Sequence, residues 1–208
     1  MNILIMLLSI LLISCCANST THDQQTKDSV CSIDQKSMDV SFLSVKLGTS
    51  RKKALEILSK QGLCPDERSN ICIVLENFAF GSHSFEYANF RMEDEKVYNI
   101  YATSVRSYDQ KTAYMVYSDL KKKFINKYGD YKTKEEKNDI KQYEELCANT
   151  LECIEFNDKL TKITLDFLLF KTDKKPGDLI IDNWDKDNWY TSITIEPHGN
   201  NHDFDDIK

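Results

Sequence analysis

The pattern of apolar and polar positions divides the chain into an apolar opening, a polar stretch, a long patterned region and a polar end. The opening covers residues 3–13, and the polar stretch covers residues 15–37. Apolar positions recur with helical or strand spacing over residues 38–197, whereas residues 198–208 are polar and acidic. A periodic apolar pattern is the main sequence signal of packed secondary structure. We therefore expect a single folded domain over the patterned region and a disordered tail after it.

Two stretches have the apolar spacing of an amphipathic helix. The first follows Thr49 and Ser50, either of which can cap a helix start, and ends at Gly62, a residue type that commonly ends helices. The second follows the N-cap residue Asp109 and ends at Gly129. Its apolar stripe consists of Ala113, Val116, Tyr117, Leu120, Phe124 and Tyr128. The pattern predicts two helices, each with one face buried.

Runs rich in Val, Ile, Phe and Tyr predict β-strands between and after these helices. Runs separated by short turns follow the first helix at residues 71–80, 84–92 and 96–105. Further strand-like runs follow the second helix at residues 151–156, 160–171 and 190–196. This order repeats a unit of one helix and three strands. We expect an α+β fold in which two helices pack on one antiparallel sheet.

The apolar opening has the length of the apolar core of a signal peptide. A membrane-spanning helix needs about 20 apolar residues, and residues 3–13 are too few. Small and polar residues follow from Ser14 onward, and no later segment has spanning length. We therefore expect an exported chain with a signal peptide at residues 1–14.

The four residues Leu-Ile-Ser-Cys at positions 12–15 resemble a bacterial lipobox. The resemblance implies cleavage before Cys15 and a diacylglycerol joined to its thiol through a thioether. Several acyl chains, such as palmitate, give stable membrane anchoring at about 0.8 kcal/mol per buried methylene. Residues 15–37 would then be a flexible tether, and the protein would face the periplasm or the exterior of the cell envelope. The alternative is ordinary cleavage after Ala17, which also follows a small-x-small pattern and would release the protein.

The net charge of −6 at pH 7 argues against a nucleic-acid partner. Nucleic-acid-binding surfaces neutralise phosphates with Lys and Arg. The strongest basic cluster, the lysines at 121–123, lies on the second predicted helix, where a charge run is typical of a solvated face. We expect no nucleic acid among the partners.

Four cysteines of the patterned region form two closely spaced pairs. Cys64 and Cys72 bracket one short loop, and Cys147 and Cys153 bracket another. Export to an oxidising compartment allows disulfides, so we expect each pair to staple its own turn, although four cysteines permit three pairings. A zinc site is disfavoured because it needs the tight Cys-x-x-Cys spacing that this chain lacks.

The histidines of the chain do not form a catalytic or metal-binding pattern. His22 lies in the predicted tether, His83 lies beside a turn, and His198 and His202 lie in the acidic end. A Ser-His-Asp triad needs a base that rigid elements hold in place, and a disordered tail gives no support to metal ligands. We expect a protein that is not an enzyme and that needs no cofactor or metal.

Aromatic residues make the predicted sheet the best candidate for a binding surface. Strict alternation places Phe85 and Tyr87 on one face of their strand, and both faces of the next strand are substantially apolar. One face must pack on the helices, and the other is either a binding surface or a second covered face. Trp residues of the Asp/Asn-rich loop are anchors for a partner or fold back to cap the sheet. The candidate surface consists of Phe85, Tyr87, Tyr98, Tyr101, Trp184 and Trp189.

The order of the elements supports a second resemblance. The helix start Leu-Gly-Thr-Ser at 47–50, followed by Ala54, Leu55, Leu58 and Gly62, resembles small bacterial lipoproteins related to the accessory lipoprotein of the outer-membrane barrel-assembly machinery. These proteins and β-lactamase-inhibitor-protein-like domains share a helix pair packed on an antiparallel sheet. The resemblance covers residues 43–196 at the level of element order and implies this arrangement of helices and strands.

Two functional hypotheses follow. The first is a membrane-anchored envelope lipoprotein that acts as a non-enzymatic binding or assembly module for a partner protein. The second is a secreted or periplasmic inhibitor or ligand-binding module. The first mature residue separates them, because anchoring requires Cys15 and release after Ala17 leaves Asn18 at the N-terminus.

Overall fold

The computed structural model describes residues 37–66, 69–138, 148–170 and 187–199. The predicted signal peptide, the predicted acylation site Cys15, nearly all of the predicted tether and the tail from residue 200 lie outside these ranges, and so do Cys147 and Trp184.

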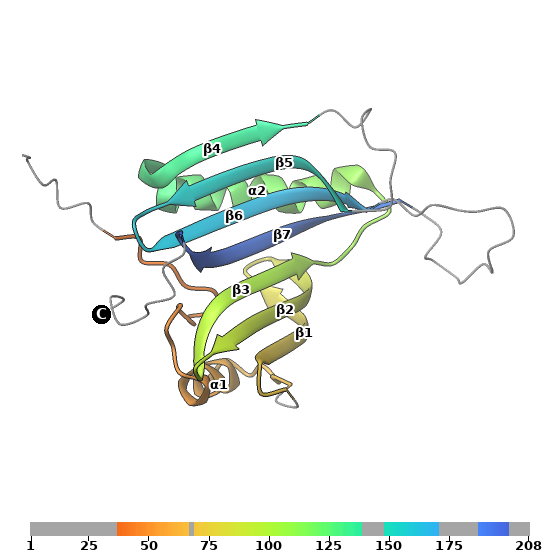
Figure 1. Cartoon of the computed structure of the whole chain (residues 1–208). Coiled ribbons are helices and arrows are strands. Elements are labelled where there is room, and N and C mark those ends of the chain that lie inside the picture. The colour runs from red at the N-terminus through yellow and green to blue at the C-terminus, as the bar shows by residue number, and fades with distance from the viewer. Residues whose placement is uncertain (1–36, 67–68, 139–147, 171–186, 200–208) are drawn as a thin grey trace, which may run out of the picture. The chain divides into compact units, whose positions relative to one another are not determined.

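One antiparallel sheet of seven strands organises the described residues (Figure 1). The strands are β1 (Cys72–Phe80), β2 (His83–Glu93), β3 (Lys96–Ser104), β4 (Lys132–Lys137), β5 (Ala148–Asn157), β6 (Thr161–Phe170) and β7 (Asn188–Pro197). Their order across the sheet is β1-β2-β3-β7-β6-β5-β4. The last strand therefore joins the two halves, because β7 pairs with β3 on one side and with β6 on the other. The expected α+β class and antiparallel sheet are confirmed.

The second half of the chain contains one more strand than the sequence pattern predicts. Strand β4, which reads Lys-Thr-Lys-Glu-Glu-Lys, forms an edge of the sheet and exposes all six side chains. A strand without apolar alternation resembles a loop in sequence, yet charged side chains are typical of edge strands because they discourage pairing with other chains. The first helix is thus followed by three strands and the second by four. The predicted repeat of one helix and three strands is not confirmed.

Both predicted helices form, and both begin at a predicted capping residue. Helix α1 (Arg51–Lys60) begins after Ser50, whose side chain accepts a hydrogen bond from the Lys53 N–H. Helix α2 (Gln110–Tyr128) begins after Asp109, whose carboxylate accepts from the N–H groups of residues 111 and 112. Such caps contribute about 1 kcal/mol each. After α2 the chain continues as a single 3-10 turn, η1 (Gly129–Tyr131), into β4.

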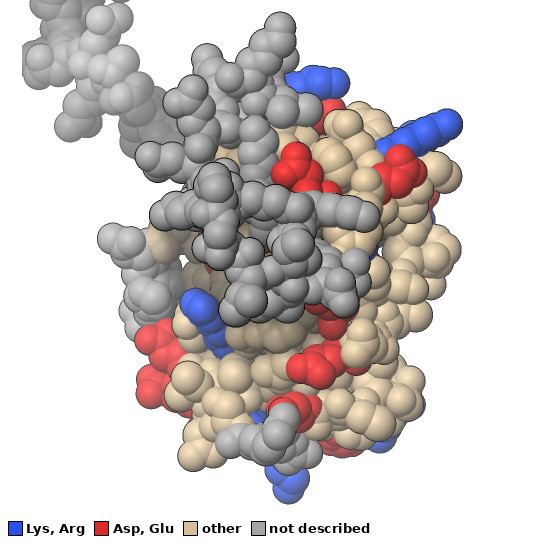
Figure 2. Space-filling view, turned by 90° about the vertical axis from the view of Figure 1, so that its right-hand side faces the viewer, with Lys and Arg blue, Asp and Glu red and all other residues tan. Residues whose placement is uncertain are grey.

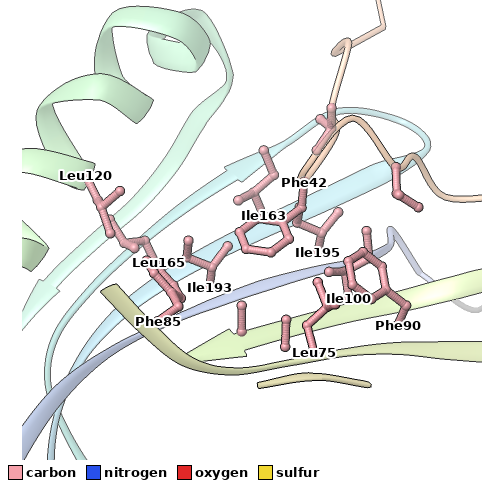
Figure 3. Packing of buried hydrophobic residues seen from close by; sticks show 14 of the residues in the cluster. Phe42, Leu75, Phe85, Phe90, Ile100, Leu120, Ile163, Leu165, Ile193 and Ile195 are labelled. Atoms are coloured by element: carbon pink, nitrogen blue, oxygen red, sulfur yellow. The ribbon is translucent and has the colours of Figure 1, made fainter. Parts of the chain in front are cut away.

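The hydrophobic core lies between the sheet and the two helices. Helix α2 lies behind β5 and β6 in the view of Figure 1 and packs most extensively on β7. Residues 38–47, which precede α1, turn tightly at Leu43 and insert Phe42 among the sheet residues (Figure 3). Full burial of one large apolar side chain contributes about 1.5–3 kcal/mol. The labelled core residues in Figure 3 come from the preceding segment, α2 and strands β1, β2, β3, β6 and β7.

A β-bulge in β2 reverses the direction of one predicted surface residue. The pairing of β2 with β3 shifts between Phe85 and Tyr87, because two residues of β2 span one step of β3. An extra residue in a strand turns the following side chain to the other face. Phe85 is therefore fully buried among Phe42, Phe78 and Phe80, and its predicted place on the binding surface is wrong.

Candidate functional site

Polar side chains form a continuous row across the face of the sheet that points away from the core. Because directly opposed residues share a face, the pairings of all seven strands define this row. It consists of Glu76, Tyr87, Thr103, Ser192, Asp166, Cys153 and Glu136, in order from β1 to β4. The adjacent row consists of Val74, Asn89, Tyr101, Thr194, Thr164, Glu155 and Lys134. We call the face that carries these two rows the open face.

The open face is hollowed where β1, β2, β3 and β7 meet. A cavity of about 440 Å³ lies there, within the range of typical ligand pockets. We call it the tyrosine cleft. It is lined by Glu76, Asn77, Glu86, Tyr87, Tyr101, Thr103, Arg106 and Tyr190. Tyrosine side chains combine a large apolar ring with a hydrogen-bonding hydroxyl, and they are enriched at the energetic centres of protein interfaces.

Backbone irregularities place the acidic residues of the tyrosine cleft. Glu86 is the extra residue of the β2 bulge, and Asn77 opposite it on β1 has a positive φ of 51°. In a regular strand, residues two positions apart share a face, so Glu76 and the buried Phe78 would point the same way. The irregularity at Asn77 sends Glu76 to the open face and Phe78 into the core. Bulges commonly re-aim side chains next to functional sites.

Arg106 closes one side of the tyrosine cleft with its cationic group. Its guanidinium carbon lies 5.8 Å from the centroid of the Tyr190 ring and 5.7 Å from that of Phe170. Its Nε lies 3.6 Å from a carboxylate oxygen of Glu86, and both side chains are about half exposed. Cation–π contacts at exposed sites contribute about 0.5–1 kcal/mol each. The cleft therefore already provides an environment that suits a cation.

Asp166 is the carboxylate closest to the middle of the open face. The Ser192 hydroxyl donates a hydrogen bond to its Oδ2 over 3.4 Å, and the Cys153 thiol is a further hydrogen-bond partner. Burial raises the pKa of Asp166 above its ordinary value, and it also raises the pKa of the Cys153 thiol to about 12. Among the described residues, Asp166 forms no ion pair closer than 4 Å. This carboxylate is thus held in the sheet by hydrogen bonds from neutral groups.

The phenol groups beside Asp166 are held in their neutral form. Burial, followed by the neighbouring Tyr190 and the negative charge of Asp166, raises the pKa of Tyr101 to about 12. Burial also raises the pKa of Tyr190, although the Arg106 cation opposes this shift. Both hydroxyls therefore remain protonated at neutral pH and can donate or accept hydrogen bonds.

Two of the predicted surface residues line the cleft. Tyr87 and Tyr101 do so, whereas Tyr98 lies half-buried on β3 beside a second register shift. Trp189 packs against the hydrophobic core, as the capping alternative for the tryptophans anticipates, and Trp184 lies outside the described residues.

The other six residues that line the cleft, and Asp166 beside it, are absent from the sequence-based surface, and three of these residues matter most for its chemistry. They are Tyr190, Arg106 and Asp166. The position of Tyr190 could have been predicted from the sequence, because the alternation that buries Ile193 in the core points Tyr190 to the opposite face. Arg106 follows the end of β3 in a loop and has no periodic pattern around it.

Cys64, Cys72 and Cys153 have free thiols, so the structure forms no bridge between Cys64 and Cys72. An isolated antiparallel bridge pairs Asp66 with Val74, and each cysteine lies two residues before its bridging residue. Because the two segments run in opposite directions, Cys64 and Cys72 lie on opposite sides of the bridge, four residues apart along its direction. Four residues of extended chain correspond to roughly 13 Å, whereas disulfides need Cα atoms within about 7 Å. Cys153 is a buried neighbour of Asp166, and its predicted partner Cys147 lies outside the described residues.

A contact between His83 and Asp119 joins the β1–β2 turn to helix α2. The Nε2 atom of His83 lies 2.6 Å from Oδ2 of Asp119, whose pKa is lowered first by Lys123 and then by His83. The hydroxyl of Ser82 lies 3.5 Å from the same ring nitrogen. A catalytic triad needs the nucleophile and the carboxylate on different ring nitrogens. His83 is therefore a structural link at a turn.

A second cavity, of about 370 Å³, lies on the helix side of the sheet between α2, β4 and β5. The buried carboxylate of Glu152 lies at its wall and accepts a hydrogen bond from the Tyr114 hydroxyl over 3.2 Å. Lys137 and Lys121 lie 3.1 and 3.6 Å from this carboxylate. Because its oxygens are already paired, Glu152 has an evident structural role in tying α2 to the edge of the sheet.

No protein-family model, curated protein or solved structure matches this chain. Within the described ranges, no group of three or more His, Cys, Asp and Glu side chains is placed to hold a metal ion. No helix in the same part of the chain is long and apolar enough to cross a bilayer. Assignment of a function therefore rests on the geometry of the open face.

Proposed function

We propose that this chain is an envelope lipoprotein whose open face binds a partner protein. The observation that carries the binding half is the tyrosine cleft, in which Tyr87, Tyr101 and Tyr190 come from three different strands and line one cavity. Aromatic residues grouped in a cavity on a rigid sheet supply contact area at a low cost in conformational entropy. On the side of the molecule in view in Figure 2, both acidic and basic side chains are exposed among uncharged ones.

The proposal is non-enzymatic because the Cys153 thiol and the Tyr101 phenol of the open face are poor nucleophiles and poor bases at neutral pH. A thiol and a phenol with pKa values of about 12, at Cys153 and Tyr101, are almost wholly protonated at pH 7. A reactive cysteine or general base needs a pKa near the working pH. These groups are suited to hydrogen bonding.

The anchoring half rests on the lipobox-like residues at 12–15, and metabolic labelling with palmitate tests it. We expect label on the wild-type chain and none on Cys15→Ala. The matched control is Cys16→Ala, which removes the adjacent thiol and should keep the label. Label that survives Cys15→Ala would refute the anchor, and a mature chain that begins at Asn18 would favour the secreted alternative.

Photo-crosslinking in intact cells tests the binding half. A benzophenone amino acid replaces Tyr87 or Tyr101 in the cleft, or Lys122 on the exposed side of α2 as the control. We expect the two cleft positions to give the same protein adduct and the control position to give none. Adducts of equal yield from all three positions, or from Lys122 alone, would contradict a partner at the open face.

A further inference from the structure

Carboxylates outnumber cations around the tyrosine cleft, where Arg106 is the cationic lining residue. Glu76 and Glu86 line it, and Asp166 lies two strands from the cleft residue Thr103 in the same row across the sheet. Neighbouring strands are about 4.8 Å apart, so the Cα atoms of Thr103 and Asp166 are separated by roughly 10 Å. A long side chain that enters over Thr103 can therefore reach the Asp166 carboxylate.

The residues that separate the cleft from Asp166 in this row have small side chains. Thr103 and Ser192 lie between the cleft and Asp166, and Tyr101 and Tyr190 flank them along β3 and β7. Both phenols interact electrostatically with Asp166. The carboxylate thus has two aromatic neighbours, and its hydrogen-bond partners are the neutral groups of Ser192 and Cys153.

A buried carboxylate without a counter-ion is costly, and a cation relieves that cost. Among the described cations, Lys162 has only a weak effect on Asp166, because its ammonium group pairs with Glu155 at 3.5 Å and Glu196 at 3.7 Å. The raised pKa of Asp166 agrees with this lack of a counter-ion.

Arg106 shows that the cleft accommodates a guanidinium group. It stacks on the rings of Tyr190 and Phe170 and approaches Glu86 to 3.6 Å, but it does not pair with Asp166. Arg106 therefore occupies the rim of the cleft and leaves the inner carboxylate for another cation.

We propose that the tyrosine cleft receives a lysine or arginine side chain of the partner protein, whose cationic group pairs with Asp166 beside Tyr101 and Tyr190. This inference rests on the proposed function and adds the chemistry of the partner. Charge complementarity supports it, because the chain carries a net charge of −6 and a basic segment would be attracted over a distance. The interaction weakens with added salt, as the rim carboxylates are screened.

The test uses a displayed library of random 12-residue peptides selected on the full purified chain. Selected peptides are synthesised with a fluorophore, and their dissociation constants are measured by fluorescence anisotropy. We expect one Lys or Arg to recur at a fixed position, and we expect its replacement by norleucine to weaken binding about 10-fold or more.

Four variants locate the contact. Asp166→Asn, which keeps size and hydrogen bonding, should weaken the basic peptides about 10-fold. Arg106→Ala should tighten them because it removes a like charge that repels the incoming cation. Asp94→Asn removes an exposed carboxylate in the β2–β3 turn and should have no effect. Tyr101→Ala should weaken every peptide that binds in the cleft. Circular dichroism melting curves verify that each variant is folded.

The outcomes separate the two proposals. Peptides that depend on Tyr101 but lack a recurring basic residue, or that bind Asp166→Asn as well as the wild type, would overturn the basic side chain and leave the binding face intact. Peptides that bind Tyr101→Ala as tightly as the wild type would contradict both the basic side chain and the binding face. A gain in affinity from Arg106→Ala would support a cation in the cleft, because loss of a residue with only a structural role would not tighten peptide binding.

Discussion

Replacement of Phe85 by alanine tests which face of the sheet carries the core. The Phe85 side chain is 0% exposed, and its ring centroid lies 5.6 Å from those of Phe78 and Phe80 and 6.2 Å from that of Phe42. Substitution of a core Phe by Ala typically costs 3–5 kcal/mol, because it removes apolar burial and leaves a cavity. Loss of three aromatic contacts places Phe85 toward the upper end of that range.

The matched control is Tyr87→Ala, which removes a ring two residues away on the opposite face. Tyr87 is half-buried beside the cleft, so we expect a loss of about 1 kcal/mol or less. Urea unfolding followed by tryptophan fluorescence measures both variants. With a slope of about 2 kcal/mol per molar urea, Phe85→Ala should lower the midpoint by roughly 2 M and Tyr87→Ala by less than about 0.5 M.

A third variant separates loss of volume from loss of the aromatic contacts. Phe85→Leu keeps most of the apolar volume and should cost about 1–2 kcal/mol. Equal midpoint shifts for Phe85→Ala and Tyr87→Ala, or a larger shift for Tyr87→Ala, would refute the bulge and the assignment of the open face.

Three further predictions concern buried polar groups. Tyr117→Phe should raise the free energy of unfolding by about 1 kcal/mol, since the buried Tyr117 hydroxyl has no hydrogen-bond partner among the described residues; a clear loss of stability in urea titrations would argue for a partner. Because burial raises the pKa of Asp166, its ionisation disfavours folding as pH rises above the unfolded value of about 3.9. Asp166→Asn should therefore gain stability relative to the wild type between pH 3 and pH 7, and an advantage confined to acidic pH would contradict this. In the native protein, maleimide should modify the exposed Cys64 rapidly and the buried Cys153 only after unfolding; mass spectrometry that finds Cys64 unmodified without reductant would indicate a disulfide.

The parts of the fold with strong local signals could be predicted from the sequence. The Asp109 cap and the apolar stripe of α2 identify that helix from residues that lie close together in the sequence. The β1–β2–β3 meander is likewise identified by apolar runs separated by short turns. Strand β4 could not be found in this way. Its six exposed side chains have no apolar period, and only its pairing with β5 makes it a strand.

Prediction of the site fell short for a related reason. Tyr87 and Tyr101 are recognisable in the sequence as aromatic strand residues. The position of Asp166 beside the cleft, in contrast, follows only from the order of the strands in the sheet. Asp166 faces Ser192 because β7, the last strand, inserts between β3 and β6. Contacts across such a distance in sequence leave no periodic trace in either strand.

The error at Phe85 and the position of the cleft have the same physical origin. Period-two alternation puts Phe85 and Tyr87 on one face, which would expose a phenylalanine or bury a tyrosine beside it. The extra residue Glu86 resolves this conflict by sending Phe85 into the core and Tyr87 to the open face. The same bulge leaves Glu86 at the rim of the cleft within 3.6 Å of Arg106. The irregularity that defeats a simple pattern is therefore also the feature that brings an aromatic ring and a carboxylate together at the proposed binding site.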